Sequence, residues 1–326
     1  MTAGEHDDAP LRLVDVDNAP AGAFGELEPT SPPLTDAQGR IRLSFSRIDT
    51  YQNCPRKFRF RYVDRLPTLP SPHLSFGTSV HNALEAFHDR KLPEAPSAEE
   101  LLGFLYDGWD HRGFAHLERD EQLAHYRHAQ QVLRRYHARV APTYRLPVTT
   151  EAWFEVPFEH EAVVVGAIDR IDADEDGDLH VVDYKTSRKA RPRTEVARSL
   201  QLALYALACR NLYGRLPATV SLDFVVPGVT VTVPVDELDL EAARSAVLET
   251  AAAIRAERYP TTPNRLCDWC DHRAVCPAWP DDPAPSYGAM ATDVEERRRR
   301  LAREVRELRE LEAGLDRLAS ELDLDS

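Results

Sequence analysis

The stretch Gly166–Lys185 constrains the fold most strongly, because GAIDRIDADEDGDLHVVDYK has the pattern of a single β-hairpin. Apolar runs at 163–168 and 179–182 flank an acidic turn at 172–178 that is rich in Asp and Gly. Two β-runs separated by such a turn are the usual signal for paired antiparallel strands. We therefore expect a sheet to be built around this hairpin.

Charged residues end both of these strands. We expect Asp169 to close the first strand and Asp183 and Lys185 to close the second, with the Tyr184 side chain on the opposite face. Carboxylates at strand ends bind hard cations, so Asp169 and Asp183 are candidate ligands of Mg²⁺ or Mn²⁺, together with the Tyr184 carbonyl. Lys185 would position or help deprotonate an attacking water and offset charge on a phosphate. On spacing alone, exposed ion pairs worth about 0–1 kcal/mol explain these residues equally well.

Hydrophobic periodicity elsewhere alternates between helices and strands. Helical spacing dominates 97–140, and a period of two begins at Glu151. Further on, the pattern predicts a helix closed by Gly214, a hairpin and a last helix, at 200–213, 219–235 and 240–257. This order predicts a mixed α/β (α+β) core, with a helical insertion at 97–145.

Two helices carry polar pairs spaced for one face. His81 and Glu85 lie four residues apart on a helix that Thr78 or Ser79 would cap. Gln201 and Tyr205 have the same spacing on an otherwise apolar helix, where Gln201 would need a polar partner. A lone histidine such as His81 is more often a surface or core residue than a ligand.

Three of the 5 cysteines, Cys267, Cys270 and Cys276, form a C-x2-C-x5-C cluster. In a reducing compartment such a set indicates metal or cluster ligation more than disulfides. Cys209 lies in the apolar helix and is expected to be an inert core thiol.

The two ends of the chain differ in composition from its middle. Residues 1–40 are acidic and rich in Pro, Ala and Gly, which predicts a disordered tail before a domain at 41–285. Residues 290–326 predict a charged helix with an incomplete Leu heptad seam, which is a candidate for self-association or a protein partner. No apolar run approaches the roughly 20 residues of a membrane span, and no leader pattern begins the chain, so we expect a cytoplasmic protein without membrane contact.

The net charge of −14, taken alone, argues against a polyanionic partner. The acids are concentrated at the ends, however, and residues 41–292 carry 35 acids against 30 bases. A basic run at 56–65 offers a local track for phosphates, although snorkelling surface arginines are an equal explanation. Net charge therefore does not exclude a nucleic acid.

Taken together, the motifs resemble the PD-(D/E)XK nuclease superfamily, in particular its RecB-like branch with an iron–sulfur cluster. This branch includes the AddB nuclease domain and the CRISPR-associated adaptation exonucleases. The resemblance covers roughly residues 42–280, and its segments, in the family's order, are SFSRIDTYQNCP, GTSVHNALE, GAIDRID, VVDYKTS, QLALYAL and CDWCDHRAVCP. Ile168 stands where the family's name has a proline, which changes no chemical group.

The resemblance implies a restriction-endonuclease-like mixed sheet flanked by helices, and it implies a role for each motif residue. By position it makes His81, Asp169 and Asp183 metal ligands and Lys185 the catalytic lysine. It makes Gln201 and Tyr205 the supporting motif, and it gives Glu85 a possible role behind the ligands.

The resemblance also makes Cys54 the fourth ligand beside Cys267, Cys270 and Cys276. A [4Fe–4S] cluster on these thiols would close the domain as a staple. By spacing alone the four cysteines could equally hold Zn²⁺.

The implied activity is a Mg²⁺/Mn²⁺-dependent deoxyribonuclease, in particular a single-strand exonuclease of the RecB family that acts in DNA repair or recombination on DNA with a free end. The alternative is a non-catalytic DNA-binding or regulatory subunit of a helicase–nuclease or CRISPR adaptation complex. Asp169, Asp183 and Lys185 are all present, which favours the enzyme. The chain lacks a G-x-x-x-x-G-K-[ST] loop, so a helicase motor would have to be on another chain.

Overall fold

A computed structural model describes residues 33–279 of the chain, except 67, 69–70 and 90–92. The predicted tail up to residue 32 and the predicted helix at 290–326 lie outside the described residues. Residues 33–40, which the sequence assigned to the tail, form a turn in which Asp36 accepts a hydrogen bond from Arg40 Nε (2.7 Å), and Thr35 bridges to Ile41.

The described residues form a mixed sheet of 6 strands. The hydrogen-bonded order is β1-β3-β4-β5-β6. β1 and β4 pair with different ends of one edge of β3, and β2 pairs with the opposite edge. The pairs β1–β3 and β4–β5 are parallel, and the remaining pairs are antiparallel. The strands are β1 Ile41–Leu43, β2 Thr149–Phe158, β3 Ala162–Ala173, β4 Leu179–Lys185, β5 Thr219–Phe224 and β6 Val229–Pro234. This arrangement confirms the predicted mixed α/β core.

Both predicted hairpins are present. The β3–β4 turn contains Gly177 at φ 81° and the β5–β6 turn contains Gly228 at φ 71°, conformations that glycine adopts without a Cβ penalty. The middle strand of the sheet, β3, buries Val163, Val164 and Ile168 almost completely, as expected for a strand covered on both faces.

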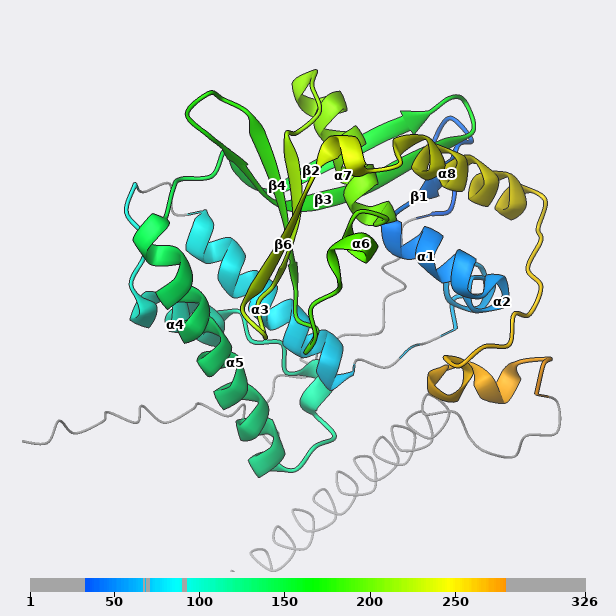
Figure 1. Ribbon diagram of the computed structural model, residues 1–326. Helices are drawn as coiled ribbons and strands as arrows, with labels where there is room; N and C mark the ends of the chain where they lie inside the picture. The colour runs from blue at the N-terminus through cyan, green and yellow to red at the C-terminus, as the bar shows by residue number, and fades with distance from the viewer. Residues whose placement is uncertain (1–32, 67, 69–70, 90–92, 280–326) are drawn as a thin grey trace, which may run out of the picture. The chain divides into compact units, whose positions relative to one another are not determined.

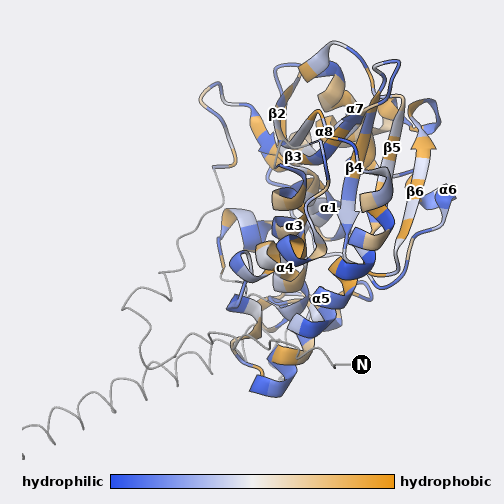
Figure 2. Ribbon diagram, turned by 90° about the vertical axis from the view of Figure 1, so that its left-hand side faces the viewer, coloured by the Kyte–Doolittle hydropathy of each residue, from blue (hydrophilic) through white to orange (hydrophobic). Residues whose placement is uncertain are grey.

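Helices cover both faces of the sheet (Figure 1). One group packs against β1, β2, β3 and β5 and consists of α1 Phe45–Asn53, α7 Leu200–Tyr213 and α8 Leu240–Arg255. The other group consists of α3 Pro72–His88, α4 Ala98–Asp107 and α5 Arg119–Val140, and it includes the predicted helical insertion. In Figure 2 the outer helix α5 is largely hydrophilic, whereas α7 is largely hydrophobic because it lies in the main core.

Short helical turns connect these elements. They are α2 Pro55–Phe58, α6 Arg193–Val196, the π-helical turn η1 Arg59–Val63, and the 3₁₀ turns η2 Arg112–Phe114, η3 Ala141–Thr143, η4 Val235–Glu237, η5 Cys267–Trp269 and η6 Arg273–Val275. No helix among the described residues combines the length and apolar character needed to cross a bilayer.

The start of α3 differs from the prediction. The helix begins at Pro72 and is capped by Ser71, whose hydroxyl accepts a hydrogen bond from Leu74 N. Ser79 lies inside the helix, where its hydroxyl donates to Ser75 O (2.7 Å). A serine in a helix interior commonly bonds back to the preceding turn, so the cap-like sequence at this point was misleading.

Candidate active site

The candidate site lies where β3 and β4 separate. Their antiparallel ladder ends at the pair Arg170–Val182, after which β4 continues beside β5. The prediction that Asp169 closes β3 is therefore wrong, because β3 extends to residue 173 and Asp169 lies inside it. Its Oδ2 accepts a hydrogen bond of 2.7 Å from Tyr184 N, so a carboxylate replaces the backbone acceptor that the ladder would have supplied.

Asp183 and Lys185 lie on one face of β4, at the same fork. Asp183 is almost fully buried, with 2% of its side chain exposed, and Lys185 Nζ lies 2.5 Å from its Oδ2. This contact is an ion pair without the geometry of a hydrogen bond, so Asp183 Oδ2 is buried without a hydrogen-bond partner. The Lys185 ammonium balances the charge of this oxygen, so a metal ion would have to share the oxygen with Lys185 or displace it.

The amide of Gln201, on α7, joins these two charged groups. Gln201 Oε1 accepts from Lys185 Nζ (2.8 Å), and its Nε2 donates to Asp183 Oδ1 (2.8 Å). The same nitrogen donates to the hydroxyl of Tyr205 one turn later (2.9 Å). The expected polar partners of Gln201 are thus present, and the buried amide fixes the orientation of Asp183 and Lys185.

His81 reaches the fork from α3, on the other side of the sheet. Its Nδ1 lies 3.5 Å from Asp169 Oδ2. Gly77 of α3 lies close to the residue after β4, because a Cβ there would be 3.2 Å from the Thr186 hydroxyl, which would have to shift slightly. The opening between β3 and β4 therefore lets one site receive side chains from both helical layers.

Glu151 is a site residue that the sequence analysis did not identify. It lies opposite Asp169 in the β2–β3 register, between the pairs Thr150–Arg170 and Ala152–Ile168. Its φ of 44° is unusual for a residue with a side chain, and such strain is commonly kept at functional sites. The only signal in the sequence was that the strand periodicity begins at this acid, and the sequence did not show which residue would lie opposite it.

The carboxyls of this site repel one another. Burial, followed by the charge of Asp183, raises the pKa of Asp169 to about 8. Burial and then Asp169 and Glu85 raise the pKa of Glu151 to about 7. Burial also lowers the pKa of His81, so the imidazole is favoured in its neutral form, in which it can act as a ligand.

The donor set fits a divalent cation. Oxygen ligands with clustered negative charge suit Mg²⁺ or Mn²⁺, and such a cation would relieve the repulsion between Asp169 and Asp183. As the side chains stand, no three His, Cys, Asp or Glu residues within the described ranges are gathered closely enough to hold an ion. The ligand assignments of Asp169, Asp183, Tyr184 and His81 therefore stay predictions.

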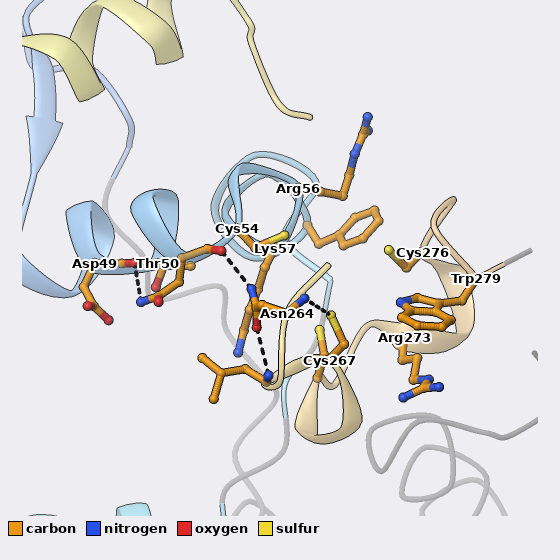
Figure 3. Close-up of a pocket in the computed structure, with 14 residues that line it drawn as sticks. Asp49, Thr50, Cys54, Arg56, Lys57, Asn264, Cys267, Arg273, Cys276 and Trp279 are labelled. Atoms are coloured by element: carbon orange, nitrogen blue, oxygen red, sulfur yellow. Dashed lines mark hydrogen bonds between the residues drawn. The ribbon is translucent and has the colours of Figure 1, made fainter. Parts of the chain in front are cut away.

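The four predicted cluster cysteines line one cavity of about 140 Å³. Cys54 is contributed by the junction of α1 and α2, and Cys267, Cys270 and Cys276 by the segment that ends the described chain. Figure 3 shows Cys54, Cys267 and Cys276 around this cavity. Thiols more than 200 residues apart in the sequence thus line one cavity, but among the described residues no three of them are close enough together to hold a metal ion, so the cluster stays a prediction.

Direct contacts also join these two segments. Asn264 Nδ2 donates to Asn53 O (3.0 Å), and Arg56 N donates to Pro260 O (3.1 Å). Cys209 lies apart from the cavity, fully buried in α7, and burial raises its pKa to about 12, in agreement with an inert thiol.

Comparisons with known proteins give one family model and several similar chains. The model of the family described as the PD-(D/E)XK nuclease superfamily matches residues 42–277. The Gene 69 protein of Mycobacterium phage D29 is 25% identical over 267 residues, which are 72% of this chain and 96% of that protein. Among solved structures, SSO0001 has a TM-score of 0.36 at 16% identity, covering 73% of this chain and 86% of that one. A candidate exonuclease from Eubacterium rectale has a TM-score of 0.44 at 13% identity, with coverages of 71% and 87%.

Proposed function

This chain belongs to the PD-(D/E)XK nuclease superfamily, and on that premise we propose that it is a divalent-metal-dependent deoxyribonuclease that degrades single-stranded DNA from an end. The observation that carries the proposal is the gathering of two largely buried carboxylates, Asp169 and Asp183, beside Lys185 at the fork. One ammonium balances one carboxylate, whereas two carboxylates held together under burial repel each other and would be stabilised by a cation.

The metal would be held by Asp169 and Asp183, with the backbone carbonyl of Tyr184 and the imidazole of His81 completing the protein's ligands. Mg²⁺ or Mn²⁺ in this position supplies Lewis acidity and lowers the pKa of water. His81 serves this role in its neutral form, which burial favours. Glu85 and Glu151 add negative charge around the ligands and so strengthen the attraction for a cation.

Lys185 would act on the substrate. Its ammonium is held by Gln201 and Asp183 and keeps 29% of its side chain exposed, so it can reach a phosphate at the fork. There it would offset the negative charge that develops on the phosphate and orient or help deprotonate the attacking water. Gln201 and Tyr205 would act through Lys185 and Asp183, as positioning residues.

We further propose that the chain is of the RecB-like, AddB-like branch and that Cys54, Cys267, Cys270 and Cys276 hold a [4Fe–4S] cluster. The support is their shared cavity and the segments' own hydrogen bonds, which already join the two ends of the domain. The cluster would stabilise this closure. Zn²⁺ is the alternative, and iron, sulfide and zinc analysis with a visible spectrum separates the two.

The proposal places the protein in a reducing cytoplasm, because thiol ligands must stay reduced. It also gives the protein a role in DNA repair or recombination. The helix predicted at 290–326 would contact a protein partner or a second copy. A non-catalytic DNA-binding subunit is the competing function. It predicts DNA binding by the wild-type protein without Mn²⁺-dependent cleavage.

The test uses single-stranded DNA labelled at one end, with the other end free or blocked, in Mg²⁺ or Mn²⁺. Lys185→Ala and Asp183→Ala should abolish degradation while circular dichroism shows a folded protein. Asp236→Ala removes an exposed carboxylate after β6 and should leave the activity unchanged. Activity that persists in Lys185→Ala or Asp183→Ala would contradict the assignment of the site.

A further inference from the structure

A cationic segment follows Lys185 directly along the chain. Residues 186–198, which connect β4 to α7 and include α6, contain five basic residues and one acid, in a chain whose net charge is −14. Arg193 is the only one of the five that forms an ion pair with a described residue, Glu237. The other four are exposed, and they are Arg188, Lys189, Arg191 and Arg198.

The segment is held in place by the rest of the domain. At its start, Thr186 lies close to Gly77 of α3. The Ser187 hydroxyl donates to Lys189 O (3.0 Å), which closes a turn, and further on Val196 of α6 is fully buried. Because this backbone is already ordered, a ligand that binds its cations pays little conformational entropy.

Helix α5 adds positive charge beside the segment. Arg135 is exposed, and its Nη2 donates to Val226 O (3.3 Å), which follows β5 at the edge of the sheet where β4 also ends. Burial, followed by the positive charges of Arg135 and Arg188, lowers the pKa of His128, which lies on the same face of α5 as Arg135. The charged groups that act on His128 are all positive, so α5 and the segment meet as surfaces of one sign.

The other basic run of the chain, at 56–65, has contacts of its own. Arg59 pairs with Asp64 at 3.3 Å. The guanidinium of Arg61 lies 5.4 Å from the centre of the Tyr62 ring. Of the two explanations that the sequence left open for this run, the structure favours surface arginines over a track for phosphates.

We propose that residues 186–198, together with Arg135, form a cationic track that binds the phosphates of a DNA strand beside Lys185. Arg188 follows Lys185 by three residues, which span at most about 11 Å, so both cations act on the same short stretch of the strand. Like charges gathered without acidic partners are favourable where a polyanion supplies the counter-charge. That the polyanion is DNA rests on the proposed function.

The test measures the binding of a labelled single-stranded oligothymidylate to the full-length protein by fluorescence anisotropy, at several salt concentrations. EDTA in the buffer prevents metal-dependent cleavage. The double variant Arg188→Gln with Lys189→Gln removes two exposed cations from the cationic track, so it should weaken binding about tenfold at low salt. The slope of log affinity against log salt should also fall by about 1.4, because each phosphate contact contributes about 0.7 for a single strand.

Two control pairs remove the same charge from other parts of the surface. Arg145→Gln with Arg215→Gln changes arginines that contact the β3–β4 turn, at the other end of β4 from Lys185. Arg59→Gln with Arg61→Gln changes the run at 56–65. Both pairs should keep the affinity and the salt dependence of the wild type.

The comparison of the three pairs decides the proposal. Weaker binding with a smaller salt slope in the pair at 188 and 189 alone supports the cationic track. An equal loss in either control pair would overturn it, because net charge would then explain the binding. Unchanged binding in the pair at 188 and 189, or no binding by the wild type, would overturn it as well.

The nuclease assay is interpreted separately from these binding measurements. A wild-type protein that binds DNA through the cationic track but shows no Mn²⁺-dependent cleavage would contradict the proposed function and leave the track standing. Cleavage by the wild type, combined with normal binding by the pair at 188 and 189, would contradict the track alone.

Discussion

Replacing Asp169 with asparagine should stabilise the metal-free protein at neutral pH and at the same time abolish nuclease activity. The ordinary pKa of an aspartate is 3.8, and burial with the charge of Asp183 raises that of Asp169 to about 8. The folded state therefore favours the protonated carboxyl. There is no penalty below about pH 4, and the penalty grows as the pH rises from about 4 to about 8.

The magnitude follows from the size of this shift. At pH 7 the displacement of about three pH units corresponds to at most about 4 kcal/mol. Asp183 shares the repulsion, and asparagine keeps an oxygen that can accept from Tyr184 N. We therefore expect Asp169→Asn to raise the free energy of unfolding by about 1–3 kcal/mol at pH 7–8, and by much less at about pH 5.

Urea denaturation in EDTA at about pH 5 and about pH 8 measures this difference. Asp172→Asn is the matched control, because Asp172 lies on the same strand and its carboxylate pairs with Arg170 at 3.1 Å, so its loss should destabilise the protein. Mn²⁺ should raise the stability of the wild type, more at high pH than at low pH, and have little effect on Asp169→Asn. A variant that is equally destabilised at both pH values, or that keeps the Mn²⁺ effect, would refute the reasoning.

Three further substitutions test other parts of the structure. Gln201→Leu removes the amide that bridges Asp183 and Lys185. We expect about 1–3 kcal/mol lower stability and at least tenfold slower cleavage, with DNA binding in EDTA retained; normal cleavage would contradict a positioning role. Glu151→Gly relieves the strained φ of 44° and part of the repulsion, so thermal unfolding should shift upward while cleavage slows. An unstable but fully active variant would argue against this account. Cys54→Ser should lower both iron content and melting temperature, and unchanged values of both would exclude the staple.

Local pattern was sufficient for much of the candidate site. The spacing of Asp183 and Lys185 places both on one face of any strand, and the spacing of Gln201 and Tyr205 places both on one face of any helix. The acidic Gly turn predicted the hairpin, because few other conformations suit such residues. These properties depend on neighbours in the sequence, so they could be inferred without the fold.

Glu151 and the point where β3 and β4 separate could not be inferred in this way. Glu151 is opposite Asp169 only because β2 pairs with β3 in one register, and a shift of one residue would turn its side chain to the other face. Asp169 lies inside β3 rather than at its end, because residues 170–173 beyond it still pair with β4, and 170–171 also with β2. Strand register and partner choice come from packing across the whole sheet.

The sequence by itself determined the chemistry of Gly166–Lys185, namely two carboxylates and a lysine beside a hairpin, because those identities and spacings are written in the chain. Only the tertiary structure decided that the two strands part at Asp169 and Asp183. That opening admits His81 from one helical layer to Asp169 and Gln201 from the other to Asp183. The physical reason is that β4 stays paired with β5 from His180 to Lys185 while its ladder with β3 ends at Arg170–Val182, a divergence that is set by packing across the whole sheet.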